Sequence, residues 1–233
     1  MSIGVECTAW IFVNYAPGSF GSFLTKVIEL STDVSGEKKS NIFDKNNASH
    51  RHISLWIRNL HDGDEIDQWA SWPTDQQGQY IAENINQQNT TLRRVHRLTV
   101  PKYNYKFRHH FTNAQFIKIT VDKNQIDLVA KNMSNKTFGH WIANKVTVPL
   151  KTILTRVSEE DQRKYYLGEC RKRIINIVDN TEEPNTFNFS VGTFFDSNEF
   201  ISTVNRLTNW LEIAPVDCGV LHQEFLTRHK GLT

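Results

Sequence analysis

The chain of 233 residues suits one α/β domain, and its 39% hydrophobic and 22% charged residues are ordinary for a globular protein. A formal net charge of +2 does not favour a nucleic-acid-binding protein, and it is compatible with a small anionic ligand. No apolar run reaches the ~20 residues that span a bilayer, and no secretory leader is apparent. We therefore expect a cytoplasmic protein with no membrane partner. Its three cysteines are widely separated and are expected to be reduced.

The first predicted element is a short buried strand at residues 9–15, which is apolar, aromatic and β-branched. A helix follows at residues 22–31, because apolar side chains recur there at helical spacing. These side chains are Phe23, Leu24, Val27 and Ile28. The polar segments near 33–50 and 75–92 are interpreted as insertions rather than domain boundaries. A second strand is expected from Val95 to Val100.

The second half of the chain continues the alternation of strands and helices. Strands are predicted at residues 116–121 and 187–191, and helices at residues 124–133 and 200–211. A long helix and a final amphipathic helix complete the pattern. Two of the helix starts carry capping residues, Ser158 and Asp196. Such alternation predicts a single α/β domain over residues 1–233, with a central, mostly parallel sheet in a three-layer α/β/α arrangement.

The loop Pro17–Ser22 connects the first strand to the first helix, and its small residues are typical of phosphate-binding loops. Backbone N–H groups and the positive end of the helix dipole favour an anion at such a position. The loop does not match the Walker A pattern, because Ser22 occupies the lysine position. A tight strand-to-helix turn is the alternative interpretation.

The same run resembles the 5′-phosphosulfate loop of cytosolic-type sulfotransferases, P-K-S-G-T-T-W-L. Aligned with that loop, this chain reads Pro17, Gly18, Ser19, Phe20, Gly21, Ser22, Phe23 and Leu24. Three of the eight positions, Pro17, Ser19 and Leu24, are identical, and Gly18 stands where the family has its lysine.

Later segments resemble that family in the same order along the chain. His96 lies in an apolar, β-rich stretch, like the family's catalytic histidine. The segment Phe111–Asn124 is similar to the family's F-P-N-A-K motif, its following strand and the basic residue after that strand. The stretch Phe194–Ile213 resembles a late helix with a charged cap. The resemblance therefore covers about half of the chain.

The resemblance implies a P-loop NTPase-like topology and transfer of a sulfuryl group from 3′-phosphoadenosine 5′-phosphosulfate. The acceptor would be a hydroxyl or amine of a small molecule or carbohydrate, and no metal is expected. His96 would act as the general base, since neutral histidine has a suitable pKa. The loop would bind the phosphosulfate, while Lys123, Lys131 and the late pair Lys230-Gly231 would lie toward the 3′-phosphate.

Three other functions stay open on the sequence alone. A chain without the loop lysine could bind a nucleotide or anion without catalysis, or could be a degenerate small-molecule kinase. A non-enzymatic interaction protein is the third alternative. His50 and His52 could be two metal ligands on one strand face, but no third ligand is apparent. Arg171-Lys172-Arg173 is interpreted as an exposed helix face.

Overall fold

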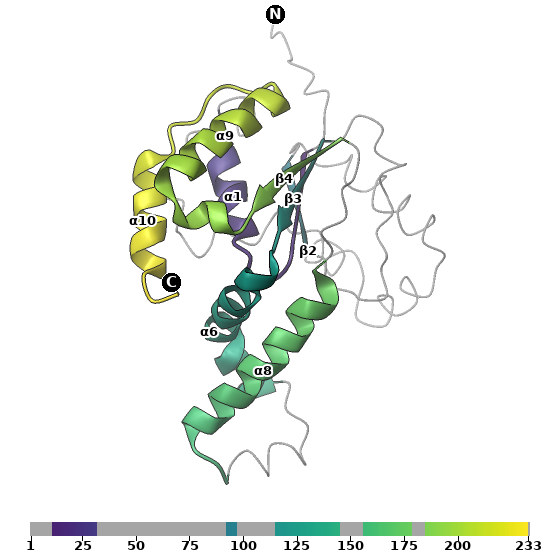
Figure 1. The fold of residues 1–233 in the computed structure, drawn as a ribbon, viewed down its shortest axis with the longest axis vertical. Coiled ribbons are helices and arrows are strands. Elements are labelled where there is room, and N and C mark those ends of the chain that lie inside the picture. The colour runs from purple at the N-terminus through teal and green to yellow at the C-terminus, as the bar shows by residue number, and fades with distance from the viewer. Residues whose placement is uncertain (1–10, 32–91, 97–114, 145–155, 179–184, 233) are drawn as a thin grey trace, which may run out of the picture.

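The computed structural model describes five stretches of the chain, residues 11–31, 92–96, 115–144, 156–178 and 185–232 (Figure 1). Both predicted insertions lie outside these residues, apart from Leu92. The predicted strand at 95–100 is described only as far as His96.

Four strands form one parallel sheet in the order β2-β1-β3-β4. They are β2 (Leu92–His96), β1 (Ile11–Tyr15), β3 (Gln115–Thr120) and β4 (Thr186–Ser190). Every neighbouring pair runs parallel, which confirms the predicted α/β class and the parallel sheet. The side chains of Val13 in β1, Ile117 in β3 and Phe189 in β4 are fully buried.

The strand order places a topological switch point at the centre of this sheet. The chain leaves β1 for β2 on one side, whereas it leaves β3 for β4 on the other side. Because β1 and β3 are neighbours, the connections diverge beyond their carboxyl ends. In open α/β sheets, ligands bind in the crevice at such a point. The loop after β1 begins there.

One face of the sheet is covered by α1 (Gly21–Ile28), α9 (Ser197–Leu211) and α10 (Gly219–His229) (Figure 1). Between β4 and α9 lies the short 3₁₀ helix η4 (Gly192–Phe195). Phenylalanine rings from β4, from these helices and from the residue before α1 form a continuous aromatic core. Its central members are Phe20, Phe23, Phe189, Phe194, Phe200 and Phe225. Aromatic packing of this kind fixes α1 against the two C-terminal helices.

The helices α6 (Ile126–Asn144) and α8 (Glu159–Ile177) pack side by side and project from the carboxyl end of the sheet (Figure 1). The 3₁₀ helix η3 (Lys123–Gln125) links β3 to α6. Phe138 and Trp141 of α6 pack on Tyr166 of α8, with ring centroids 5.9 and 4.5 Å apart. This second contact surface explains why α6 runs well beyond residue 133, where the predicted helix ends.

Both predicted helix caps are confirmed. The Ser158 hydroxyl accepts a hydrogen bond from the Asp161 N–H at 3.1 Å. The Asp196 carboxylate accepts from the N–H groups of Asn198 and Glu199, both at 2.9 Å. Each cap satisfies backbone donors that the first helical turn leaves unpaired. Cys170 and Cys218 are buried free thiols, and Cys7 lies outside the described residues.

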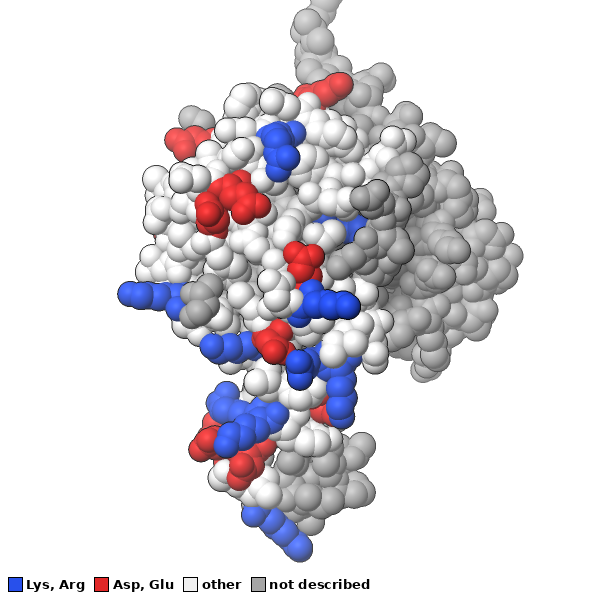
Figure 2. All heavy atoms as spheres, viewed as in Figure 1, with Lys and Arg blue, Asp and Glu red and all other residues white. Residues whose placement is uncertain are grey.

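The described helices include none that is long and apolar enough to cross a membrane. The basic run on α8 is exposed, as predicted, and two of its three charges are paired with acids. Arg171 contacts Asp127 at 2.7 Å, and Lys172 contacts Glu169 at 2.8 Å. Figure 2 shows the same mixture of blue and red side chains along the projecting helix pair.

Candidate functional site

The loop after β1 is a tight turn with two left-handed residues. The Ser19 N–H donates to the Ala16 carbonyl at 3.1 Å, so Pro17 and Gly18 occupy the two central positions of a β-turn. Gly18 has φ +88°, which is the conformation that a type II turn requires at its third residue. Phe20, the N-cap of α1, also has a positive φ of 65°. A left-handed non-glycine residue costs about 1–2 kcal/mol.

The two glycines of the loop are required by close packing. A Cβ on Gly18 would lie 2.5 Å from the Val129 carbonyl oxygen of α6. A Cβ on Gly21 would lie 2.1 Å from the Tyr15 ring. Position 18 therefore excludes a side chain for two reasons, its positive φ and its contact with α6. The family lysine has no room where this chain has Gly18.

One face of α6 lies against the loop. Val129 approaches Gly18, and the Asn132 side-chain amide donates to the Gly18 carbonyl at 2.7 Å. Met133 is also next to Gly18, and Lys136 follows one turn later. These residues have the i, i+3, i+4, i+7 spacing of a single helix face. The face that fixes the turn therefore also brings Lys136 to the loop.

Lys136 and His229 both contact the Phe20 ring. The Lys136 ammonium is 5.7 Å from the ring centroid, within the range of a cation–π interaction. The His229 ring, at the end of α10, meets Phe20 edge-on with centroids 5.2 Å apart. Its Nδ1 donates to the Phe225 carbonyl at 2.8 Å, which leaves Nε2 for another partner. Sequence reasoning did not identify either residue as part of a site.

The electrostatic environment of this pair is basic. Lys136 keeps an exposed side chain, yet the protein around its ammonium lowers its pKa by desolvation. Burial is also the main cause that lowers the pKa of His229, and the charges of Lys136 and Arg228 lower it further. Within the described part of the chain, no carboxylate pairs with Lys136. A nearby anion would favour the charged form of this lysine.

The side chains of the predicted loop residues differ in their burial and in the groups that they contact. The Ser19 hydroxyl is buried and donates to the Ala16 carbonyl at 2.6 Å, so it stabilises the turn. Ser22 is exposed in the first turn of α1, and its hydroxyl lies 3.2 Å from the Tyr15 hydroxyl. Phe23 is buried and stacks on Phe225, with centroids 4.4 Å apart. Ser22 is therefore the loop hydroxyl best placed to face a ligand.

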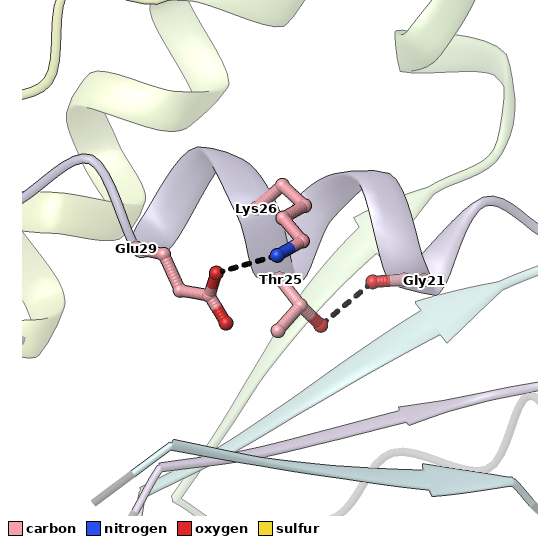
Figure 3. A network of polar contacts seen from close by, with 4 residues as sticks. All are labelled: Gly21, Thr25, Lys26 and Glu29. Atoms are coloured by element: carbon pink, nitrogen blue, oxygen red, sulfur yellow. Dashed lines mark hydrogen bonds and ion pairs between the residues drawn. The ribbon is translucent and has the colours of Figure 1, made fainter. Parts of the chain in front are cut away.

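The lysine within α1 does not serve the loop. Lys26 donates to Glu29 at 3.1 Å, and the two side chains are only 10% and 6% exposed. Figure 3 shows the Lys26 ammonium joined to the Glu29 carboxylate along α1. Thr25 donates to the Gly21 carbonyl at 2.8 Å on the same helix.

The predicted 3′-phosphate residues separate into one pair and one isolated lysine. The Lys131 ammonium donates to the Gly231 carbonyl at 2.7 Å, so the structure brings together two residues that the resemblance assigned to one phosphate. Lys123 is exposed in η3 and takes no part in this contact. His96 ends β2 at the register position opposite Tyr15, which places its backbone at the strand end where the loop begins.

Neither protein-family models nor curated proteins give a match to this chain. The described residues contain no group of three or more histidine, cysteine or acidic side chains arranged to hold a metal. His50 and His52 lie outside the described residues.

Proposed function

We propose that this chain is a sulfotransferase-like enzyme of three-layer, P-loop-type topology. It would bind 3′-phosphoadenosine 5′-phosphosulfate at the loop Pro17–Ser22 and move the sulfuryl group to a hydroxyl or amine acceptor. One observation carries the proposal: a small-residue turn leads from β1 into α1 at the switch point of a parallel sheet. This is the position where such folds bind nucleotide phosphates.

The reaction needs three contributions from the protein. The acceptor oxygen or nitrogen attacks sulfur, while the bond from sulfur to the bridging phosphate oxygen breaks. His96 takes the acceptor proton, and 3′-phosphoadenosine 5′-phosphate leaves with the bonding electrons. The loop N–H groups and the Ser22 hydroxyl stabilise the charge that develops on the leaving phosphate, because electrostatic positioning dominates such transfers.

The contact between Lys131 and Gly231 supports the nucleotide assignment. It joins α6 to the residues after α10, and the end of α10 also contacts Phe20 of the loop. A nucleotide with its 5′ group on the loop would extend toward this contact with its second phosphate. Lys131 would then exchange a carbonyl partner for a phosphate, which a lysine binds as a point charge.

Binding is tested by the thermal shift and calorimetry of the full chain with 3′-phosphoadenosine 5′-phosphate. Ser22→Ala should weaken binding by about tenfold or more, because a hydrogen bond to a charged group contributes roughly 1.5–3 kcal/mol. Ser202→Ala, on an exposed turn of α9, is the matched control and should bind like wild type. No binding at millimolar nucleotide would end the proposal.

A second function is favoured by the geometry at Gly18. Because the family lysine has no room there, the chain is also a candidate for a nucleotide-binding protein without transfer activity. Radiolabelled donor with a panel of phenol, amine and sugar acceptors distinguishes the two functions. Sulfuryl transfer that is lost in His96→Ala supports the enzyme. If wild type shows no transfer and His96→Ala binds the nucleotide as wild type does, the chain is a binding protein. ATP with magnesium, in the same assays, tests the kinase alternative.

A further inference from the structure

The loop cannot obtain a positive charge from its own strand–turn–helix unit. Position 18 excludes a lysine because of its positive φ and its contact with the Val129 carbonyl. Lys26 is held in a nearly buried ion pair with Glu29. An anionic group at the loop would therefore need a counter-charge from another part of the fold.

The face of α6 that packs on the loop can supply this charge. Asn132 and Met133 hold Gly18, and Lys136 lies one turn further along the same face. Its ammonium is within 5.7 Å of the ring centroid of Phe20, the residue that immediately precedes α1. The cation therefore lies beside the side chain of the residue that precedes α1, and the free N–H groups at the start of a helix favour an anion.

The end of α10 adds a second basic group to the same place. His229 contacts the Phe20 ring, and its Nδ1–H is occupied by the Phe225 carbonyl. Burial, and then the charges of Lys136 and Arg228, lower the pKa of His229, and a nearby anion would raise this pKa. Lys136 has no carboxylate partner among the described residues, in contrast to the paired lysines of α8.

We propose that Lys136, with His229 beside it, replaces the missing loop lysine and binds the 5′-phosphosulfate or phosphate group of the nucleotide at the start of α1. This proposal rests on the proposed function, and it assigns to Lys136 the positive charge that the bound phosphate group needs. In sulfuryl transfer, Lys136 would neutralise the negative charge that the leaving phosphate gains when its bond to sulfur breaks. In the free protein, the cation rests against the Phe20 ring.

The test compares Lys136→Met, Lys136→Arg and Lys164→Met by calorimetry with 3′-phosphoadenosine 5′-phosphate and with inorganic pyrophosphate. Lys136→Met should bind at least about tenfold more weakly, since it removes a charged hydrogen-bond donor. Lys136→Arg should restore most of the affinity. Lys164 is exposed and paired with Glu160 on α8, so Lys164→Met controls for the loss of one positive charge.

The pKa of His229, followed by NMR of the imidazole nitrogens, gives a readout that a change in stability would not produce. In Lys136→Met without ligand, this pKa should rise, because the repulsion from Lys136 is lost while the burial and Arg228 remain. Pyrophosphate should raise it in wild type. An unchanged His229 pKa in Lys136→Met would refute the proximity of the two groups.

The outcomes separate this inference from the proposed function. Nucleotide binding of wild-type strength in Lys136→Met overturns the role of Lys136 and leaves the function standing. Pyrophosphate binding that depends on Lys136, without any nucleotide binding, supports the anion site and overturns the nucleotide assignment. If wild type binds neither probe, both proposals fail.

Discussion

Gly21→Ala is expected to destabilise the protein strongly, because the added methyl group would meet the Tyr15 ring. The added Cβ would lie 2.1, 2.2 and 2.5 Å from three carbons of the Tyr15 ring, where ordinary contacts start at 3.4 Å. The ring is only 3% exposed and cannot move aside without disturbing β1. Overpacking in a core costs about 1–3 kcal/mol, and an overlap of more than 1 Å places this variant near 3 kcal/mol. A protein of this size would then lose roughly 6–12 °C in Tm.

Gly139→Ala is the matched control for this experiment. Gly139 lies within α6, and an added Cβ there has no atom within 4 Å. Alanine is a better helix former than glycine by about 0.5–1 kcal/mol, so this variant should be slightly more stable than wild type. Urea unfolding followed by circular dichroism measures both free energies of unfolding. If Gly21→Ala is as stable as wild type, the Tyr15 ring does not cover the loop, and the close-packing argument for the turn is wrong.

Three further predictions concern the C-terminal helices and the candidate base. Burial lowers the pKa of His222, despite opposing contributions from the Phe194 carbonyl and Asp196. The unfolded state therefore binds more protons than the folded state below pH ~6.5. The free energy of unfolding should fall as the pH drops below this value, by at most about 1.4 kcal/mol per pH unit. His222→Gln should lack this component in urea titrations, and equal slopes would contradict it. Asp196→Ala should cost about 1 kcal/mol by loss of the α9 cap, with Asp196→Asn close to wild type in thermal melts. His96→Asn should keep nucleotide affinity within about twofold but slow transfer by roughly 10²–10⁴-fold in the donor assay, and unchanged turnover would exclude His96 as the base.

The fold class was predictable because local patterns agreed with the tertiary structure. The bounds of the predicted strand at 116–121 differ from those of β3 by one residue at each end. The apolar stripe of the predicted helix at 200–211 is buried along its length. Ser158 and Asp196 cap helices as their side-chain chemistry predicts. In each case, the signal lies within a few neighbouring residues, where spacing and side-chain type determine the outcome.

The extent of α6 was not predictable from the same signals. Its apolar spacing toward the sheet ends near Met133, and the following residues are mostly polar. The helix continues because Phe138 and Trp141 pack on α8 instead, so the buried face turns toward a different partner. A single hydrophobic stripe identifies one contact surface, whereas this helix has two.

The candidate site was only partly predictable, for a related reason. The loop sequence indicates the turn, but it does not show that Ser19 stabilises the turn from within while Ser22 remains exposed. Asn132 reaches Gly18 across 114 positions of the chain, and Lys136 reaches the loop by the same packing. No local pattern distinguishes Lys136 from the other exposed lysines of the chain.

Lys26 and Lys136 differ in how easily each could bind an anion at the loop, and the lysine nearer to the loop in sequence is the less suitable one. Lys26 is close to the loop in the chain, but moving its ammonium to a ligand would leave Glu29 as an unpaired, nearly buried carboxylate. Breaking a buried ion pair typically costs about 3–5 kcal/mol, which would cancel most of the gain from a new contact with a phosphate. Lys136 gives up only a cation–π contact of about 0.5–1 kcal/mol at an exposed site. Any anion at the loop therefore favours the lysine on α6, and its binding depends on the packing of α6 and α10 as much as on the turn itself.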